Sequence, residues 1–344
     1  MVPGGTKLLI SRRTFLRGVV ALSASGATLG GYALGEPFRL RVKRYKITPP
    51  NWPAGLRVKF AVIADLHVIE PWMGLSRVAQ IVARTNALEP DAVLMVGDYM
   101  PSSGMRRWAR RVGGGVIPVD DWASVLGRLE APMGVHAVLG NHDWWEDDEA
   151  QARGMGPTVA GLAIERAGIA VYENRAVRFD KQGQAFWLAG LGDQDAILQR
   201  NGPGYSDTRF HSSDDVYDLS SGFNPMMDRK RYGGVDDLPA TIRQVTDEAP
   251  VILMAHEPDI FAKMGDLADR VSLTVSGHTH GGQIQVLGFA PVVPSQYGSR
   301  YVYGHIVEDQ RNLIVSAGLG CSGVPVRFGA PPEIVLIELG GETA

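Results

Sequence analysis

Short apolar stretches that end in aspartate, asparagine or histidine recur along this chain, and they constrain its fold more than any other feature. Each stretch is rich in Val, Ile, Leu and Ala, which is typical of a buried strand. The five stretches and the residues that follow them are 58–64 with Asp65 and His67, 91–96 with Asp98, 135–139 with Asn141 and His142, 251–255 with His256, and 271–275 with His278 and His280. Sites in layered α/β proteins form at the carboxyl ends of strands, so we expect these side chains to converge.

The last of these strand ends, Gly277-His278-Thr279-His280-Gly281, indicates a metal centre. Two histidines two positions apart cannot share a helix face, but they suit a bend after a strand, where flanking glycines let the backbone turn sharply. A neutral imidazole is the commonest metal ligand. Any single histidine could be a packed, hydrogen-bonded residue. Five of the eight in this chain lie at such strand ends, which makes coincidence implausible.

Helices are expected between the strands. Helical periodicity predicts Ser76–Leu88, with Ser76 as its N-cap, and Thr158–Ala167, and Thr241–Glu248 is expected to be helical too. Alternating basic and apolar residues over Arg39–Lys46 predict an edge strand with its charges in solvent. Further strands are expected at 171–172, 186–191, 312–316 and 333–339. This alternation predicts a layered α/β domain.

Residues 1–35 are expected to be a leader that is separate from the fold. Ser11-Arg12-Arg13-Thr14-Phe15-Leu16 resembles a twin-arginine signal, and an uncharged run follows it from Gly18 to Gly35. Such a signal directs export of folded proteins, so we expect the twin-arginine export machinery as a partner and a periplasmic or inner-membrane-anchored location. The weaker alternative is a chance arginine pair. Cleavage near Ala33-Leu34-Gly35 and retention as an anchor both stay open.

The chain after the leader is divided into a short N-terminal part and a main domain, which contains two insertions, 101–122 and 193–240. Residues 36–55 are interpreted as an N-terminal strand and a rigid proline-rich linker, and residues 56–344 as the main domain. Within it, residues 101–122 are expected to form a loop, whose four arginines (106, 107, 110 and 111) either meet an anionic phosphate or form a solvated face. Residues 193–240 are polar with little periodicity, which favours a lid or specificity insertion over a disordered excursion.

Composition narrows the classes of site and partner. Cys321 is the only cysteine, which excludes an internal disulfide and a thiolate zinc cage. The formal net charge is -3, and the leader contributes four positive charges and no acid, so its removal would leave -7. A body this acidic argues against nucleic acid as the main partner.

The strand-end residues occur in the same order as the motifs of a known family: from about Leu56 to the C-terminus, the sequence resembles the calcineurin-like metallophosphoesterases. The matching blocks are Asp65-Leu66-His67, Gly97-Asp98, Gly140-Asn141-His142-Asp143, His256 and Gly277-His278-Thr279-His280. Further stretches, such as Ala255-His256-Glu257-Pro258-Asp259 and Tyr297-Gly298-Ser299-Arg300-Tyr301, are similar to a bacterial subgroup of exported or membrane-associated members, the YkuE/YaeI-like proteins.

The resemblance implies an α/β (α+β) fold, namely a four-layer αββα sandwich with mixed sheets flanked by helices. It also implies two divalent metal ions (Mn, Fe, Zn or Co), with Asp98 bridging them. The implied ligands are Asp65, His67 and His280 for one ion, and Asn141, His256 and His278 for the other. Two such ions clamp a phosphoryl group and lower the pKa of bound water, so that hydroxide is available near neutral pH. A metal-dependent phosphoester hydrolase is therefore expected.

His142 and Asp143 are the expected catalytic residues beside the ligands. The family does not use the counterpart of His142 as a ligand, so we expect it to stabilise the transition state or to protonate the leaving oxygen. Asp143 is expected to orient that imidazole, with a simple turn residue as a nearly equal alternative. The neighbouring Trp144 and Trp145 either stack on a base or sugar or pack in the core.

The three remaining histidines are weaker candidates. His136 lies in the body of a strand and is interpreted as a buried packing residue. His305 has no ligand spacing around it, and His211 lies in the long insertion, either as a substrate contact or as an exposed residue.

The expected substrate is a phosphodiester or pyrophosphate of a phosphorylated small molecule or a lipid-linked envelope molecule, and membrane association is expected with it. Relatives of the subgroup hydrolyse the pyrophosphate of UDP-2,3-diacylglucosamine in lipid A synthesis. That reaction belongs on the cytoplasmic side of the inner membrane, so an export signal weakens this particular assignment. The alternatives are a broad nucleotide phosphodiesterase and a non-catalytic binding scaffold, and the intact ligand set opposes the scaffold.

Overall fold

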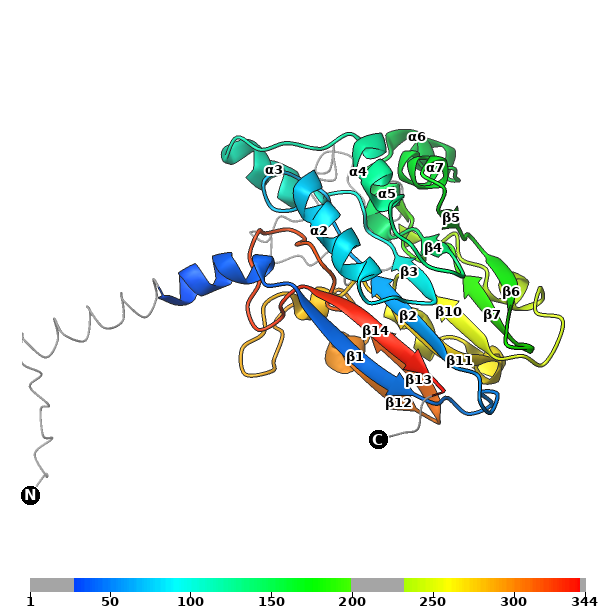
Figure 1. Ribbon diagram of the computed structural model, residues 1–344. Coiled ribbons are helices and arrows are strands. Elements are labelled where there is room, and N and C mark those ends of the chain that lie inside the picture. Colours follow the sequence, from blue (N-terminus) through cyan, green and yellow to red (C-terminus); the bar gives the residue numbers. More distant parts are fainter. Residues whose placement is uncertain (1–27, 199–231, 341–344) are drawn as a thin grey trace, which may run out of the picture.

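The chain folds around two six-stranded β-sheets, which the computed structural model in Figure 1 shows packed face to face. The structure describes residues 28–198 and 232–340. Most of the predicted leader and the middle of the predicted insertion 193–240, including His211, lie outside the described residues.

The first sheet is mixed. In spatial order its strands are β1 (Arg41–Ile47), β14 (Glu333–Leu339), β2 (Val58–Ile63), β3 (Ala92–Val96), β4 (Val135–Val138) and β5 (Ala170–Val171). Strands β2 to β5 are parallel to one another, whereas β14 runs antiparallel to β2 and parallel to β1. The predicted edge strand near Arg39–Lys46 is therefore confirmed as β1.

The second sheet is also mixed. In spatial order its strands are β12 (Gly304–Glu308), β13 (Arg311–Val315), β11 (Val271–Ser276), β10 (Val251–Met254), β7 (Gln184–Gly190) and β6 (Arg175–Lys181). The four central strands are parallel, and the two edge strands are antiparallel to their neighbours. Both edge strands are only partly buried. A short pair, β8 (Ile197–Leu198) and β9 (Tyr232–Gly233), lies apart.

Helices cover the outer face of each sheet. The first sheet is covered by α2 (Leu75–Asn86), α4 (Val119–Leu126) and α7 (Val159–Arg166). The second is covered by α8 (Leu238–Ile242) and the 3-10 helices η6 (Pro258–Ala262) and η7 (Gly265–Arg270). The other short helices are η1 (Glu36–Phe38), α3 (Ser103–Arg111), α5 (Asn141–Trp145), α6 (Asp148–Arg153), η8 (His280–Gly282) and η9 (Gly298–Tyr301).

Strand periodicity explains the four layers. In β2, Phe60 and Val62 point between the two sheets, whereas Ala61 and Ile63 point to the covering helices. Successive side chains of a strand face opposite sides, so a strand buried on both sides is apolar throughout. Phe60 and Phe186, one from each sheet, meet edge to face with their ring centroids 5.9 Å apart. The predicted αββα sandwich with mixed sheets is confirmed.

The prediction of a loop over residues 101–122 is wrong. This stretch forms α3 and the start of α4. The side chain of Ser102 caps α3 by accepting a hydrogen bond from the backbone N of Met105, and two of the four arginines lie in the last turn of the helix. A serine cap and cations near the C-terminus both stabilise a helix, and the triple glycine directly after α3 obscured this pattern.

Two helix predictions need smaller corrections. The helix α2 begins at Leu75, and its N-cap is Gly74 rather than Ser76. The predicted helix Thr241–Glu248 is instead the short α8, which ends at Ile242 and begins after the cap Asp237.

The N-terminal segment approaches the body at one end of the first sheet. Its described part is helical over residues 28–35, continues into η1 and then enters β1 (Figure 1). Among the described residues, no helix is both long and apolar enough to cross a membrane.

Candidate metal centre

The seven predicted ligands lie together where the carboxyl ends of β2, β3 and β4 from one sheet face those of β10 and β11 from the other. All seven are buried. The backbone N of His278, after β11, donates a hydrogen bond to Oδ1 of Asp65, after β2, at 2.8 Å. The strand ends of the two sheets are therefore in direct contact, as the sequence pattern predicts.

The first group of possible ligands consists of Asp65, His67 and His280, whose ligand atoms all lie within 4.8 Å of one another. The Nε2 atoms of the two histidines are 3.0 Å apart, and Nε2 of His280 is 3.8 Å from Oδ1 of Asp65. The other carboxylate oxygen of Asp65 is buried without a hydrogen-bond partner.

The second group consists of Asp98, His256 and His278, again with ligand atoms within 4.8 Å. Nδ1 of His278 lies 3.3 Å from Nε2 of His256 and 3.0 Å from Oδ1 of Asn141. Asn141 therefore joins this group, as the resemblance implies.

Asp98 lies between the two groups. Its Oδ2 is 3.5 Å from Nε2 of His67 in the first group and 3.3 Å from Nε2 of His256 in the second. Its Oδ1 accepts a hydrogen bond from the backbone N of His142 at 2.8 Å. A single carboxylate oxygen thus faces both groups, which is the position that a bridging ligand needs.

The backbone at these residues is strained. Five of the seven predicted ligands have positive φ angles between 44° and 68°, namely Asp65, His67, Asp98, His278 and His280. Such angles are uncommon for residues other than glycine, and they cluster at functional sites. The strain turns each side chain away from its strand and towards the cluster.

Two glycines are required by the close packing of these strand ends. A Cβ on Gly97, which has a φ of +94°, would lie 2.5 Å from Nδ1 of His256. A Cβ on Gly277 would lie 2.6 Å from Oδ2 of Asp65. Any larger residue would displace a predicted ligand.

Backbone carbonyls fix the tautomers of two histidines. Nδ1 of His67 lies 2.8 Å from the carbonyl oxygen of Met100, and Nδ1 of His256 lies 2.7 Å from that of Val96. A carbonyl only accepts hydrogen bonds, so in the neutral ring Nδ1 carries the proton and Nε2 presents its lone pair to the cluster. Metal-binding histidines are commonly held in this way.

His280 has a different partner. Nη2 of the buried Arg327 lies 3.1 Å from its Nδ1, and the guanidinium also binds the carbonyls of Gly320 and Ala330. A guanidinium only donates, so Nδ1 of a neutral His280 accepts and Nε2 carries the proton, facing Nε2 of His67. A metal ion held by Nε2 of His280 would require the other tautomer, with the proton on Nδ1, and so would break the hydrogen bond from Arg327.

The charge balance of the site favours a bound cation. Burial raises the pKa of Asp65 to about 7 and lowers the pKa of His67 to about 3, so both shifts oppose the charged form of the side chain. Burial also lowers the pKa of His256, but the carboxylate of Asp98 outweighs it and raises that pKa well above its ordinary value. Unprotonated imidazoles are the form that binds metal ions. Together with the unpartnered oxygen of Asp65, these features fit divalent cations of the kind that imidazole and carboxylate ligands accept.

The expectation that Asp143 orients the His142 imidazole is not supported. Its Oδ1 accepts hydrogen bonds from the backbone N of Tyr99 and Met100, and its Oδ2 accepts from those of Asp98 and Gly140, at 2.9 to 3.0 Å. The side chain thus joins the turn after β3 to the turn after β4. The alternative of a turn residue describes Asp143 better.

The carboxylate that faces His142 is that of Glu146, one helical turn later in the chain. Nδ1 of His142 lies 3.7 Å from Oε1 of Glu146, whose other oxygen pairs with Arg106 at 2.9 Å. Burial lowers the pKa of His142, but the nearby carboxylates of Asp98 and Glu146 outweigh it and raise the pKa above its ordinary value. The spacing of four residues on a helix could have identified Glu146 from the sequence.

A second carboxylate pair lies behind His256 and was missed in the sequence. Asp193 and Glu257 are both buried, and one oxygen of each has no hydrogen-bond partner. Burial and the adjacent Glu257 raise the pKa of Asp193 well above its usual range. No local motif marks this pair, because Asp193 follows β7 and Glu257 follows β10.

The other aromatic and histidine candidates have structural roles. Trp144 and Trp145 are buried, and Trp145 stacks on Tyr232 with ring centroids 5.2 Å apart. His136 is buried against Tyr172, as expected of a packing residue. His305 is exposed on β12 and binds the side chain of Asn312.

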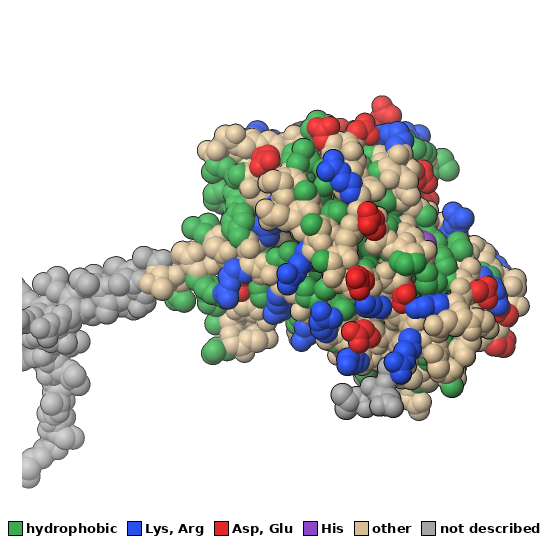
Figure 2. Space-filling model, in the orientation of Figure 1, with side chains coloured by type: hydrophobic (Ala, Val, Ile, Leu, Met, Phe, Trp, Pro, Cys, Tyr) green, Lys and Arg blue, Asp and Glu red, His purple; other side chains and the backbone are tan. Residues whose placement is uncertain are grey.

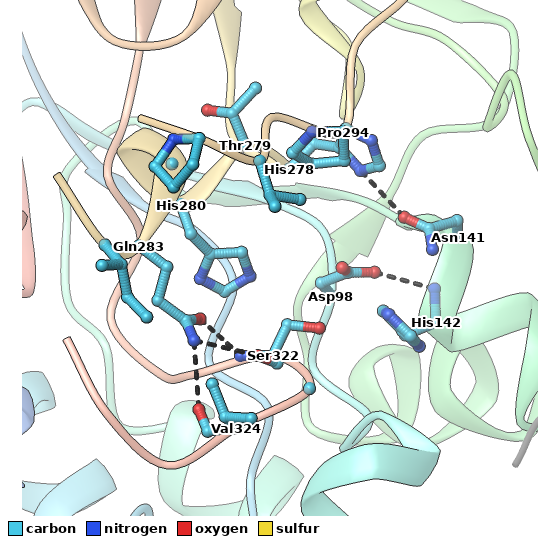
Figure 3. Close-up of a pocket in the computed structure, with 15 residues that line it drawn as sticks. Asp98, Asn141, His142, His278, Thr279, His280, Gln283, Pro294, Ser322 and Val324 are labelled. Atoms are coloured by element: carbon cyan, nitrogen blue, oxygen red, sulfur yellow. Dashed lines mark hydrogen bonds between the residues drawn. The ribbon is translucent and has the colours of Figure 1, made fainter. Parts of the chain in front are cut away.

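A cavity of about 260 Å³ opens beside the cluster. Figure 3 shows Asp98, Asn141, His142, His278 and His280 along one side of it. Apolar residues that line the rest of the cavity are Ile284, Pro291, Val292, Pro294 and Val324. The cluster therefore meets a mostly hydrophobic recess.

Comparison with known proteins finds one family over most of the chain. The sequence profile described as "Calcineurin-like phosphoesterase" matches residues 58–282. The chain is 27% identical over 336 residues to "Uncharacterized metallophosphoesterase YkuE" of Bacillus subtilis, covering 96% of this chain and 98% of that protein. It is 25% identical over 332 residues to "Phosphodiesterase YaeI" of Escherichia coli, covering 96% and 100%. A solved dimetal phosphatase from Danio rerio is 14% identical with a TM-score of 0.41, covering 76% of this chain and 88% of that one.

Replacement of Asp143 tests its part in holding the two turns. Asp143→Ala leaves four buried N–H groups without their acceptor, at roughly 1–3 kcal/mol for each unsatisfied group. We expect the free energy of unfolding, measured in urea with a chelator present, to fall by at least about 3 kcal/mol. Asp143→Asn keeps one acceptor oxygen, so its free energy of unfolding should lie between that of Asp143→Ala and that of the wild type.

The exposed Asp148→Ala is the matched control, and its unfolding free energy should change by no more than about 0.5 kcal/mol. A loss below about 1 kcal/mol in Asp143→Ala would show that other contacts hold the turns.

Proposed function

Because the chain belongs to the calcineurin-like phosphoesterase family of metal-dependent phosphoester hydrolases, we propose that it cleaves a phosphodiester or pyrophosphate bond in a lipid-linked envelope molecule. The observation that carries this proposal is the apolar cavity directly beside the paired ligand groups. A phosphoryl group at the cluster would place its apolar substituent in that cavity. The Escherichia coli relative is named a phosphodiesterase, which supports a diester substrate.

The cavity favours an aliphatic substituent over a nucleobase. Among the described residues that line it, no aromatic ring other than an imidazole is present. Trp144 and Trp145, the candidate stacking platforms, are buried in the core and unavailable to a base. These features support a lipid-linked substrate over a broad nucleotide phosphodiesterase.

Seven residues would hold two divalent ions in this proposal. They are Asp65, His67 and His280 for one ion, Asn141, His256 and His278 for the other, and Asp98 shared between them. Ions bound there would polarise the phosphoryl oxygens and lower the pKa of a bound water molecule. The short distances between imidazole nitrogens and the buried, unpartnered oxygen of Asp65 support this assignment.

His142 would donate a proton to the leaving oxygen. It lines the cavity, its backbone N is held by Asp98, and its Nδ1 faces Glu146, so Nε2 is the nitrogen available to a substrate. Its raised pKa increases the protonated fraction near neutral pH, which is the form that can donate. Glu146 is then a positioning residue, and Arg106 in turn holds Glu146.

Export by the twin-arginine pathway remains a proposal that rests on Arg12 and Arg13, which lie outside the described residues. Replacing both with lysine should leave the protein in the cytoplasm, because that pathway reads the arginine pair. Immunoblots of cell fractions measure the outcome, with Arg17→Lys as the control. An unchanged distribution would contradict the proposal.

His142→Ala separates catalysis from metal binding. With bis-p-nitrophenyl phosphate as substrate, we expect kcat to fall by roughly 10²–10⁴-fold, the usual range for losing a general acid. Metal content, measured by elemental analysis, should stay near that of the wild type because His142 is not a proposed ligand. His278→Ala should lose both activity and metal.

Loss of metal in His142→Ala would contradict its assigned role. A metal-loaded wild-type protein that hydrolyses no phosphodiester or pyrophosphate would instead favour the binding-scaffold alternative.

Val324→Asp tests the use of the cavity. A charge on its wall should oppose an acyl chain, so kcat/KM for a diacylated substrate such as UDP-2,3-diacylglucosamine should fall relative to that for bis-p-nitrophenyl phosphate by at least about tenfold. Val307→Asp, at an exposed site on β12, is the control. An unchanged ratio between the two substrates would show that the apolar group binds elsewhere.

A further inference from the structure

A hairpin beside the cavity exposes its apolar side chains to solvent. A bridge between Val286 and Phe289 closes the turn at Leu287 and Gly288. Leu287 is 104% exposed and Phe289 is 67% exposed. Contiguous apolar surface of this kind on a soluble protein commonly marks a site of contact with a partner or a membrane.

Two other segments also expose large apolar side chains. Leu29 and Leu34 of the N-terminal helix and Phe38 after it are each more than half exposed. Val112 and Val116, after α3, are also half exposed. Figure 2 shows hydrophobic side chains above and below the point where the N-terminal segment leaves the body.

Hydrogen bonds and a ring contact join the N-terminal helix to the base of the hairpin. The backbone N of Phe328 donates to the carbonyl of Gln283 at 3.0 Å, and that of Gln285 donates to the carbonyl of Phe328 at 2.6 Å. The Phe328 ring also meets the ring of Tyr32 on the N-terminal helix, with centroids 5.4 Å apart. The two segments therefore lie on the same side of the molecule.

The N-terminal end of α3 is joined to the segment that leads into the hairpin. The backbone N of Gly323 donates to Oγ of its cap, Ser102, at 3.1 Å. One residue earlier, the backbone N of Ser322 donates to the Gln283 side chain at 2.8 Å. We call the exposed side chains of these three segments (residues 28–40, 103–119 and 281–299) the apolar face.

Within the apolar face the charged side chains are mostly basic, whereas Glu70, Asp120 and Asp121 are exposed next to its second segment. Its three segments contain a single acidic residue, Glu36, which is buried. Arg39, Arg110 and Arg111 are exposed there. Apolar side chains bordered by exposed arginines match an anionic lipid interface, in which the arginines meet headgroups and the apolar groups enter the acyl boundary.

The N-terminal sequence also favours contact with a lipid surface. The uncharged run from Gly18 to Gly35 ends on the apolar face, and Lys7, Arg12, Arg13 and Arg17 precede this run. The hairpin segment in turn supplies Ile284 and Val292 to the wall of the cavity. The apolar face and the mouth of the cavity are therefore parts of one surface.

We propose that the apolar face docks on a bilayer containing anionic lipids, with the hairpin Val286–Phe289 inserted at the interface. The docking itself follows from exposure and charge. Its use in catalysis rests on the proposed function, because a docked molecule could take a lipid-linked phosphoester into the cavity from the membrane.

The test uses the full, metal-loaded chain and sedimentation with vesicles of phosphatidylcholine, with and without phosphatidylglycerol. The double variant Leu287→Asp/Phe289→Asp should weaken binding by at least about tenfold, because it places charges in the acyl boundary. Arg110→Glu/Arg111→Glu should weaken binding only to vesicles that contain phosphatidylglycerol. Added salt should reduce the same component.

The matched control is Val159→Asp/Val307→Asp, which changes two apolar side chains that are 42% and 57% exposed outside the apolar face. It should bind vesicles like the wild type. The thermal unfolding midpoint of each variant shows that a loss of binding does not come from unfolding.

Wild-type binding to vesicles that survives Leu287→Asp/Phe289→Asp would overturn the proposal, as would no vesicle binding at all. A dimer that this double variant dissociates, found by analytical ultracentrifugation, would assign the apolar face to a second copy instead. Hydrolysis of bis-p-nitrophenyl phosphate without vesicle binding would refute docking alone. Vesicle binding by a catalytically inert protein would refute the proposed function alone.

Discussion

The Asp143 carboxylate is the interaction on which the metal centre depends. By accepting four backbone N–H groups, it joins the turn after β3, which carries Asp98, to the turn after β4, which carries Asn141 and His142. A charged acceptor is suited to this task because its hydrogen bonds are stronger than those of a neutral one. Without it, the two turns would present buried donors with no acceptor.

The site as a whole concentrates features that are unfavourable elsewhere in a protein. Ligand residues have left-handed backbone angles, imidazole nitrogens approach one another closely, and carboxylate oxygens are buried without partners. The two packed sheets hold these groups in place, since every strand that leads into the site is buried on both faces. Bound cations would give the close imidazole nitrogens and the unpartnered carboxylate oxygens a shared positive partner. Metal binding would therefore stabilise the folded state.

The cavity and the exposed surface beside the site bear on which substrate can bind. The cavity is apolar on the side away from the ligands, and the hairpin that helps to form its wall continues onto an exposed apolar face bordered by arginines. On the function proposed above, the cluster would bind the phosphoryl group at the inner end and the exposed surface would meet the lipid at the outer end.

The sequence by itself determined the buried strands that lead into the site, their order along the chain and the residues at their carboxyl ends, because burial on both faces leaves a continuous apolar run and the ligand-type residues interrupt it. It was wrong about residues 101–122, where the glycines after α3 obscured a capped helix. It left two roles open for Asp143, and the hydrogen bonds of the structure favour the turn residue. Tertiary structure alone decided that Arg327 reaches His280 and that Asp193 meets Glu257. It also brought the hairpin to the cavity and to the N-terminal helix. The Arg327, Asp193 and hairpin contacts join residues far apart in the chain and depend on how two sheets pack, which local periodicity does not encode.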